Sequence, residues 1–355
     1  MKRINALRKK AFEEQGFEGF LIVNEANMLY FSGFTGAAAL LISNRSENQL
    51  YVYSVNYEQA KAEVEGFQVK LVKGDENIMA KVAEQVKAME IKKLAFDTLK
   101  VESYAVLSKA LRGKTKLRMR SNLIWELRKV KDYDELTLMR KAAELTVEGM
   151  KAASEFVKPG VKEFEVAAEI EYAMRRKGSW GTAFDTIVAS GPRSAFPHGG
   201  CTEREIREGD LVVVDIGATY KHYRSDMTRT FVAGKPSERQ QRLYKLVREA
   251  QEKAIKHVKA GVNAKAVDAA ARNVIEDAGY GDFFVHGLGH GIGLEVHEPP
   301  TLSPNSKDRL TEGNVVTVEP GIYIVGYGGI RIEDAVLVHG KGCEKLTDGF
   351  YLSDY

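Results

Sequence analysis

The sequence predicts a two-domain protein, with an α/β domain over residues 1–124 and an α+β domain over residues 125–355 that contains an internal pseudo-two-fold repeat. Three observations predict this fold class. The chain of 355 residues exceeds what one hydrophobic core usually supports. Strand-like and helix-like patterns alternate along its first third, as in α/β domains. In the second domain a helix-then-strand pattern occurs twice.

Hydrophobic periodicity places the elements of the first domain. An initial helix carries Ile4, Leu7, Ala11 and Phe12 on one face and ends at Gly16. The predicted strands are 19–23, 40–43, 50–53, 67–72 and 94–97, and the predicted helices are 57–65, 77–88 and 103–111. This domain of about 120 residues is of ordinary size and contains no histidine, so we expect no metal or proton-transfer chemistry in it.

The domain boundary is predicted near Trp125. The charged segment 127–132 follows it and leads into a long helical pattern, Glu135 to Phe156, rich in Ala, Leu, Met, Glu and Lys. A charged connector before a helix is a common form of linker, although this one could equally be a single exposed turn.

The repeat in the second domain has two parts. Val-Lys-Pro-Gly-Val at 157–161 returns as Val-Lys-Ala-Gly-Val at 258–262. Further on, the segment that ends its apolar run at Asp215 returns as the segment that ends at Glu319. A pseudo-two-fold pair of halves would therefore bring these two acids together near its axis. Chance similarity between short apolar strands is the alternative.

Two more acids and one histidine lie near these strand ends. Asp226 opens a β-like run after Asp215, and Glu333 lies on a predicted strand, 330–338, after Glu319. Antiparallel returns would place each acid beside its partner. His290 comes between the two hairpins, in His-Gly-Leu-Gly-His-Gly.

These acids together indicate a bound cation. Any one of them alone is more often a solvated loop residue. Asp215 and Glu319, however, each end a run of β-branched residues, where burying a lone carboxylate is costly. Four converging carboxylates would also repel each other and raise one another's pKa. A cation is therefore their natural partner.

Composition restricts the class of protein. The net charge of +3, set against 52 basic and 49 acidic residues, gives no reason to expect nucleic acid or membrane as partner. Cys201 and Cys343 do not make a disulfide framework. Charged residues interrupt the N-terminus before any signal-peptide core could form, and no run of 18 apolar residues occurs. We therefore expect a soluble, cytoplasmic protein.

Five motifs of the second domain resemble the Xaa-Pro peptidases of the pita-bread (creatinase/aminopeptidase) metallopeptidase family in order and spacing. They are GDLVVVD at 209–215, SDMTRT at 225–230, HGLGHGIGLEVHE at 286–298, VEPGIY at 318–323 and IRIED at 330–334. Residues 27–34, NMLYFSGF, are similar to the start of that family's creatinase-type N-terminal domain. Ser54 to Tyr57 departs from the Asp-Gly-Arg-Tyr-like sequence of many relatives, which affects the subfamily assignment and leaves the metal site untouched.

The resemblance implies two divalent metal ions per subunit. Asp226 and Glu333 would bridge them, Asp215 would complete the first site, and His290 and Glu319 the second. Four oxygen donors with one imidazole suit Mn²⁺ or Co²⁺, and Zn²⁺ would also fit. Two such ions activate a shared water, so a bridging hydroxide is the expected nucleophile. By family analogy, Glu319 would relay its proton to the leaving nitrogen.

The resemblance also implies groups that contact the substrate. His198 and His297 match positions that bind the scissile carbonyl and stabilise the tetrahedral intermediate. His286 matches a position near the carboxyl end of the substrate. Arg331, two residues before Glu333 on a predicted strand, either orients a ligand carboxylate or meets the substrate.

Other polar residues of the second domain have weaker signals. Thr228 and Thr230 share one strand face with the acid that opens their strand and are candidate donors to the ligands, although threonine is ordinary in strands. His222, His257 and His339 are expected to be structural or surface residues.

The implied activity is hydrolysis of the peptide bond before proline. Xaa-Pro dipeptides are the favoured substrates, because the chain is compact and His286 or Arg331 could bind a free carboxylate. Aminopeptidase P, acting on longer peptides, is the alternative. More remote are a metal-free creatinase-type hydrolase, a methionine aminopeptidase and a non-catalytic peptide-binding relative. A homodimer is expected, because in these relatives the first domain commonly packs against the neighbouring subunit.

Overall fold

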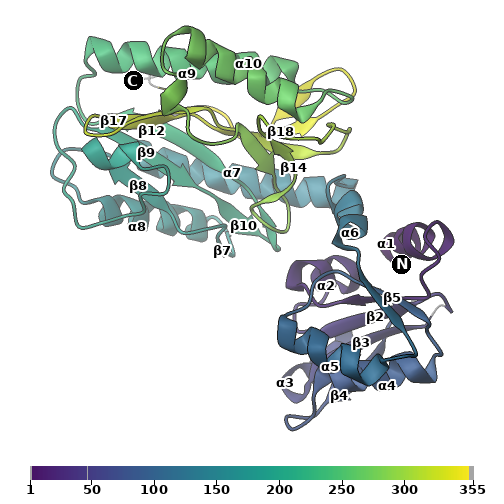
Figure 1. Cartoon of the computed structure of the whole chain (residues 1–355). Helices are drawn as coiled ribbons and strands as arrows, with labels where there is room; N and C mark the ends of the chain where they lie inside the picture. The colour runs from purple at the N-terminus through teal and green to yellow at the C-terminus, as the bar shows by residue number, and fades with distance from the viewer. Residues whose placement is uncertain (1, 46, 352–355) are drawn as a thin grey trace. The chain divides into compact units, whose positions relative to one another are not determined.

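The computed structural model describes residues 2–45 and 47–351 (Figure 1). Contacts between residues divide the chain into two compact units, Met1–Arg128 and Lys129–Tyr355. The boundary between residues 124 and 125 stays a prediction.

The first unit is built on a six-stranded sheet with strand order β4-β3-β2-β1-β5-β6 (Figure 1). Strands β1, β2 and β3 pair antiparallel, and the remaining pairs are parallel. The strands are β1 Gly19–Ile22, β2 Ala39–Ser43, β3 Asn48–Tyr53, β4 Gln68–Val72, β5 Lys93–Phe96 and β6 Lys116–Met119. The helical segments are α1 Lys2–Arg8, the π-helical turn η1 Lys9–Glu13, α2 Glu25–Ser32, α3 Ser54–Glu63, α4 Ile78–Ala88, α5 Val101–Leu111 and α6 Ser121–Arg128. Apolar residues of α4 and α5 pack with those of the sheet in one buried core.

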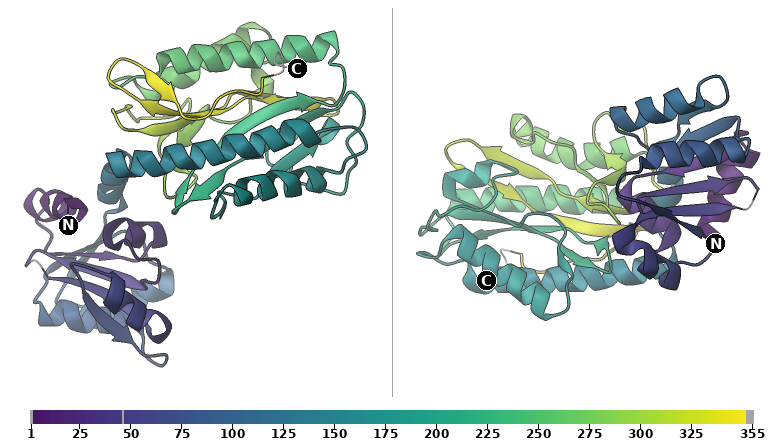
Figure 2. Two further views of the ribbon diagram at one scale, coloured as in Figure 1. Left: turned by 180° about the vertical axis from the view of Figure 1, so that it is seen from behind. Right: turned by 90° about the horizontal axis from the view of Figure 1, so that it is seen from below.

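The second unit places a layer of strands between two pairs of helices (Figures 1 and 2). The helices are α7 Tyr133–Phe156 and α8 Glu163–Arg176 on one face, and α9 Glu238–His257 and α10 Ala264–Asp277 on the other. Each pair packs its own buried core against the strands. Of the helices in residues 2–45 and 47–351, none is both long and apolar enough to cross a membrane.

Each helix pair of the second unit is followed along the chain by its own set of strands. After α8 come β7 Gly181–Thr182, β8 Ile187–Ser190, the 3-10 turn η2 Gly191–Ala195, β9 Leu211–Ile216, β10 Ala218–Tyr220, β11 Tyr223–Arg224 and β12 Met227–Val232. After α10 come the 3-10 turn η3 Gly281–Phe283, β13 Gly289–Gly291, β14 Glu298–Leu302, β15 Val315–Val318, β16 Gly321–Ile324, β17 Gly328–Arg331, β18 Asp334–Val338 and β19 Cys343–Lys345. The two central sheets have the orders β12-β9-β8 and β14-β13-β15-β18-β19.

The internal repeat is present as a repeated backbone conformation. Between α7 and α8, Gly160 has φ of 87° and its N–H donates to the carbonyl of Ile206 at 2.8 Å. Between α9 and α10, Gly261 has φ of 85° and donates to the carbonyl of Leu310 at the same distance. Positive φ at both positions requires the freedom of glycine. The predicted fold, an α/β domain followed by an α+β domain with two similar halves, is therefore confirmed.

Three elements of the first unit were not predicted: α2, β6 and α6, which spans the predicted boundary at Trp125. Helix α2 is capped by the Asn24 side chain, which accepts from the backbone N–H of Asn27 at 2.9 Å, and it ends at Gly33 with φ of 71°. Strand β6 pairs with β5 at the sheet edge, and its residues are largely exposed. Its polar composition gives only a weak strand signal.

Candidate metal centre

The first pair of predicted ligands lies at one end of the β9–β12 pairing. In this antiparallel register Asp215 is opposite Thr228, and Ile216 is opposite Met227. Asp226 directly precedes β12, so its side chain is delivered to the same end of the sheet as Asp215. This is the juxtaposition that the predicted hairpin required.

The second pair lies at the corresponding end of β15 and β18. Val318 is opposite Asp334, so Glu319 and Glu333 are the next residues beyond this register pair. The predicted continuous strand 330–338 is wrong, because it breaks between β17 and β18 at Glu333. The backbone N–H of Glu333 donates instead to the carbonyl of Thr228 at 3.0 Å, which joins the second half of the unit to the first.

His290 stands between these carboxylates on β13. Its Nε2 lies 3.4 Å from Glu319 Oε1 and 3.8 Å from Asp226 Oδ2. The flanking glycines are required by close packing, because a Cβ at Gly289 would come within 2.1 Å of a backbone oxygen on β15 and one at Gly291 within 2.4 Å of the Pro299 oxygen. The pattern Gly-His-Gly therefore lets the imidazole approach the acids closely.

The arrangement fits a metal ion. One ligand atom each from Asp226, His290 and Glu333 lie within 4.8 Å of one another. Asp215 Oδ1 and Asp226 Oδ1 are buried without a hydrogen-bond partner among the residues that the structure describes. Burying a carboxylate oxygen that accepts no hydrogen bond costs free energy, unless the oxygen binds a cation.

Electrostatics support the same interpretation. Burial raises the pKa of Asp226 well above its ordinary value, and the charges of Glu333, Asp215 and Glu319 raise it further. Burial and neighbouring carboxylates likewise raise the pKa of Glu333 well above normal, and burial raises that of Glu319. Burial lowers the pKa of His290 and so favours the neutral imidazole that binds metals. A cation would offset the cost of gathering these acids.

Threonine hydroxyls support two of the carboxylates. Thr228 Oγ1 donates to Glu333 Oε2 at 2.6 Å, and Thr317 Oγ1 donates to Glu319 Oε1 at 3.1 Å. Thr230 Oγ1 instead donates to the carbonyl of Arg331 at 3.0 Å. Thr317 was missed from sequence, although it lies two residues before Glu319 and thus on the same strand face.

Arg331 contacts a predicted ligand directly. Its Nη2 donates to Asp215 Oδ2 at 2.6 Å, its Nε to Thr228 Oγ1 at 3.1 Å and its Nη1 to the Tyr323 hydroxyl at 2.8 Å. The guanidinium is therefore placed to orient a ligand carboxylate. Its contact with substrate stays a prediction.

His286, which is partly buried, and the buried Tyr323 form a hydrogen-bonded pair next to this arginine. His286 Nε2 lies 3.0 Å from the Tyr323 hydroxyl, and the two rings are 5.5 Å apart. Burial lowers the pKa of His286 and raises that of Tyr323 to about 12, so both side chains are uncharged at neutral pH. Tyr323 belongs to the VEPGIY motif, and its hydroxyl links His286 to Arg331.

The remaining two predicted histidines, His297 and His198, are both exposed. The rings of His297 and His290 are 4.3 Å apart in a T-shaped arrangement. Partial burial lowers the pKa of His297. His198 is exposed in a turn that follows η2.

Three histidines make other contacts. His222 packs edge-on against Trp180, His257 Nδ1 lies 2.7 Å from the carbonyl of Lys253, and His339 Nε2 lies 3.5 Å from Glu344. These contacts agree with the structural or surface roles expected for them.

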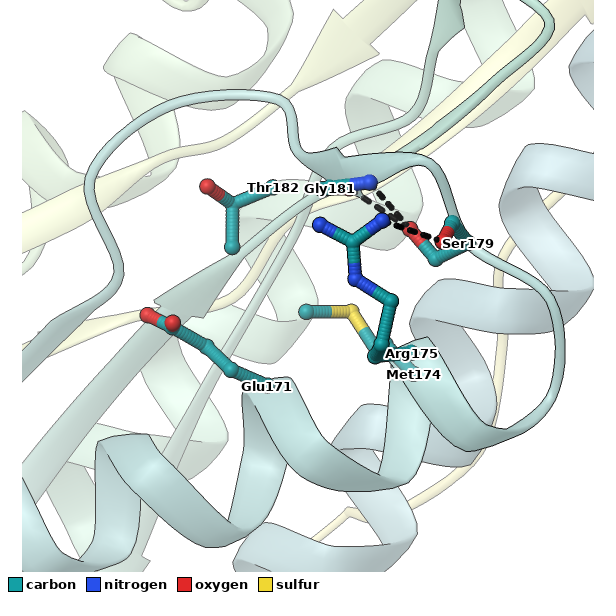
Figure 3. A pocket seen from close by; sticks show the side chains of 6 residues that line it. All are labelled: Glu171, Met174, Arg175, Ser179, Gly181 and Thr182. Carbon is teal, nitrogen blue, oxygen red and sulfur yellow. Dashed lines mark hydrogen bonds between the residues drawn. The ribbon is translucent and has the colours of Figure 1, made fainter.

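A separate cavity of about 280 Å³ lies between α8 and β7 (Figure 3). Arg175 extends toward Ser179, whose carbonyl accepts from Arg175 Nη1 at 3.1 Å, and Ser179 Oγ bonds with the backbone of Gly181. The cavity contains none of the predicted site residues. Its lining residues are Glu171, Met174, Arg175, Ser179, Gly181 and Thr182.

Comparison with known proteins agrees with the geometry. The model for metallopeptidase family M24 matches residues 137–340, and the model for the creatinase/prolidase N-terminal domain matches residues 3–130. An Xaa-Pro dipeptidase of Pyrococcus furiosus is 41% identical over 344 residues, which cover 95% of each chain.

Two solved structures are similar over nearly the full length. An Xaa-Pro dipeptidase from Bacillus anthracis is 41% identical with a TM-score of 0.92, covering 99% of this chain and 98% of that one. An X-Pro aminopeptidase from Thermotoga maritima is 40% identical with a TM-score of 0.85, covering 96% and 98%. Together with the family models, these likenesses confirm the resemblance seen in the sequence motifs: the chain belongs to metallopeptidase family M24.

Proposed function

We propose that this protein is a metal-dependent peptidase that hydrolyses the peptide bond before proline, and that Xaa-Pro dipeptides are its preferred substrates. One observation carries the proposal: Asp226, His290 and Glu333 converge within 4.8 Å, beside buried carboxylate oxygens that have no other partner in the described part of the chain. Full-length similarity to Xaa-Pro dipeptidases supports the substrate class.

The proposed centre holds two divalent ions, Mn²⁺ or Co²⁺ by preference, while Zn²⁺ would also fit. Asp226 and Glu333 would serve both ions, Asp215 the first, and His290 and Glu319 the second. When bound, such a pair of ions lowers the pKa of a shared water and polarises the scissile carbonyl. Membership of a metallopeptidase family supports the requirement for divalent metal.

Glu319 is the proposed proton carrier. It would take a proton from the attacking water at a carboxylate oxygen and deliver it to the leaving proline nitrogen. In the metal-free protein, burial raises the pKa of the Glu319 carboxyl. Thr317 and His290, which both face Oε1, orient the group.

His297 and His198 are the proposed donors to the oxyanion that develops on the scissile carbonyl. Because burial lowers the pKa of His297, its imidazole is neutral at pH 7 and still has an N–H to donate. A donor that is already in place when charge develops stabilises the transition state without reorganisation.

The dipeptide preference depends on a group that binds a free carboxylate. His286 and Arg331 are the candidates, and both are hydrogen-bonded to Tyr323. The alternative is an Xaa-Pro aminopeptidase acting on longer peptides, which the likeness to the Thermotoga maritima enzyme favours.

One assay separates these alternatives. We would compare kcat/KM for an Xaa-Pro dipeptide with that for the same peptide extended by one residue. A dipeptidase should prefer the dipeptide by about 10-fold or more, or about 1.4 kcal/mol in transition-state binding. Equal or better cleavage of the tripeptide would establish the aminopeptidase instead.

Variants of the two candidates identify the group that binds the carboxylate. Arg331→Ala also releases Asp215, so it should slow both substrates, and only the ratio between them is informative. If the preference in kcat/KM for the dipeptide over the tripeptide disappears in His286→Ala or in Arg331→Ala, the substituted side chain is the one that binds the carboxylate. A ratio unchanged in both variants would exclude both.

We further propose that the protein is a homodimer in the cytoplasm. The match to the creatinase/prolidase N-terminal domain supports the dimer, because this domain has no predicted chemistry of its own. Both cysteines, Cys201 and Cys343, are free, which supports a reducing compartment. Sedimentation at micromolar concentration tests the dimer, and a fully active monomer would refute it.

A further inference from the structure

We propose that Lys131 is a positioning residue for His297, and that it acts through a buried ion pair with Glu298. This inference rests on the role that the proposed function gives to His297. Lys131 Nζ lies 3.2 Å from Glu298 Oε2, and each side chain is only 1% exposed. Glu298 is the residue directly after His297 and the first of β14.

A buried ion pair of this kind needs a reason beyond stability. Removing two charges from water costs free energy that their attraction often fails to recover, so apolar side chains would serve a core equally well. What the pair supplies is a directional contact of defined length. Exposed surface pairs, such as Lys141 with Glu144, are solvated and contribute little to position.

Glu298 closes the loop that carries His297. Its Oε1 accepts from the backbone N–H of Glu295 at 3.0 Å while Oε2 faces Lys131. Within the loop, the backbone N–H of Gly293 donates to the carbonyl of Glu295 at 3.1 Å. A Cβ at Gly293 would lie 3.0 Å from both Glu298 oxygens and from Lys131 Cε, so the glycine leaves room for the pair.

Lys131 is itself held in place at the other end. Its backbone N–H donates to the carbonyl of Gly313 at 2.9 Å, and the Asn314 side chain donates to the carbonyl of Lys129 at 2.9 Å. Gly313, the acceptor, and Asn314, the donor, both lie in the turn that precedes β15, the strand that leads to Glu319. The ion pair therefore ties the His297 loop to the backbone that delivers a proposed metal ligand.

His297 needs such a support because the residue is exposed and its one ring contact that the structure describes is with His290. A displacement of about 1 Å of a group that meets the transition state can lower the rate about 100-fold. Loss of the Lys131 charge would leave the buried Glu298 carboxylate without its cation, which would weaken the contacts that this carboxylate makes within the loop. The loop from Gly293 to His297 would then be held less firmly.

A double-mutant cycle tests this inference. Lys131→Met, which keeps the length of the side chain and removes its charge, should lower kcat on an Xaa-Pro dipeptide about 10- to 100-fold. In a His297→Ala background the same change should cost less than about 3-fold, because the group that Lys131 positions is already absent. A merely structural role would give the same loss in both backgrounds.

A second readout uses metal-free protein and no activity. Hydrogen exchange at the backbone amide of Glu295 should be faster in Lys131→Met than in the wild type, because the contact with its acceptor, the Glu298 carboxylate, is weakened. Lys141→Met, which removes an exposed pair, is the matched control and should change neither kcat nor this exchange rate. If Lys131→Met does not fold, Lys131→Met/Glu298→Gln removes both charges and takes its place in the cycle.

The outcomes separate this inference from the proposed function. The inference alone would be overturned if Lys131→Met lowered kcat by the same factor in the His297→Ala background as in the wild type. It would also be overturned if the hydrogen-exchange rate at the Glu295 amide were unchanged in Lys131→Met. A His297→Ala variant with normal kcat would refute the proposed role of His297, and this inference with it.

Discussion

Thr228 offers the sharpest test of the candidate metal centre. Its hydroxyl donates to Glu333 Oε2 at 2.6 Å and accepts from Arg331 Nε at 3.1 Å, and it is completely buried. Thr228→Val preserves the shape of the side chain and removes both contacts. One lost hydrogen bond to a charged group costs about 1.5–3 kcal/mol. Loss of an outer contact to a metal ligand typically weakens metal binding about 10- to 100-fold.

These two estimates agree, because 10- to 100-fold corresponds to about 1.4–2.7 kcal/mol. We expect Mn²⁺ affinity of the metal-free protein, measured by competition with a fluorescent chelator, to fall by this factor. Thr230→Val is the matched control: Thr230 bonds only the backbone of Arg331, so this variant should lose stability and retain metal affinity. Equal Mn²⁺ affinity in wild type and both variants would show that Glu333 is not a ligand.

Three further predictions concern metal, acids and histidines. Removing metal should abolish hydrolysis and Mn²⁺ or Co²⁺ should restore it, whereas substantial turnover by verified metal-free protein would revive the creatinase-type alternative. Glu319→Gln should lose activity by several orders of magnitude and His297→Ala about 10²–10³-fold, with His257→Ala nearly silent in the same kcat assay. Because the native pKa values of Asp226 and Glu333 lie above the unfolded value of about 4, native metal-free protein binds more protons than unfolded protein above that pH. Its free energy of unfolding should therefore fall as pH rises from about 4 through the native pKa values, and a flat Tm over this range would contradict the raised pKa values.

The positions of the proposed ligands could be predicted because they depend on local pattern. Asp215 and Glu319 end apolar runs at equivalent places in two repeats, and strand pairing delivers Asp226 and Glu333 beside them. His290 follows from its motif, because its two glycines reflect close backbone contacts. Local sequence therefore determines which residues reach this end of the sheets.

The contacts around the ligands could not be predicted, because they depend on packing between distant segments. Tyr323 meets His286 across 37 residues of sequence, and Lys131 meets Glu298 across 167. The break at Glu333 has the same origin, since its backbone N–H leaves the expected strand to bond Thr228. Helix α2 is different, because its capping residues, Asn24 and Gly33, are local sequence signals that predict a helix between them.

The duplicated architecture has a consequence for how the two halves of the second unit hold together. Asp226 comes from the first half, and His290 and Glu333 come from the second. A cation bound by all three is therefore a cross-link between the halves, and it closes a long loop of chain. Because neither half alone supplies the full set of donors, metal binding and the docking of the halves are thermodynamically linked. Bound metal would then stabilise the contact between the two halves of this unit in addition to its role in hydrolysis.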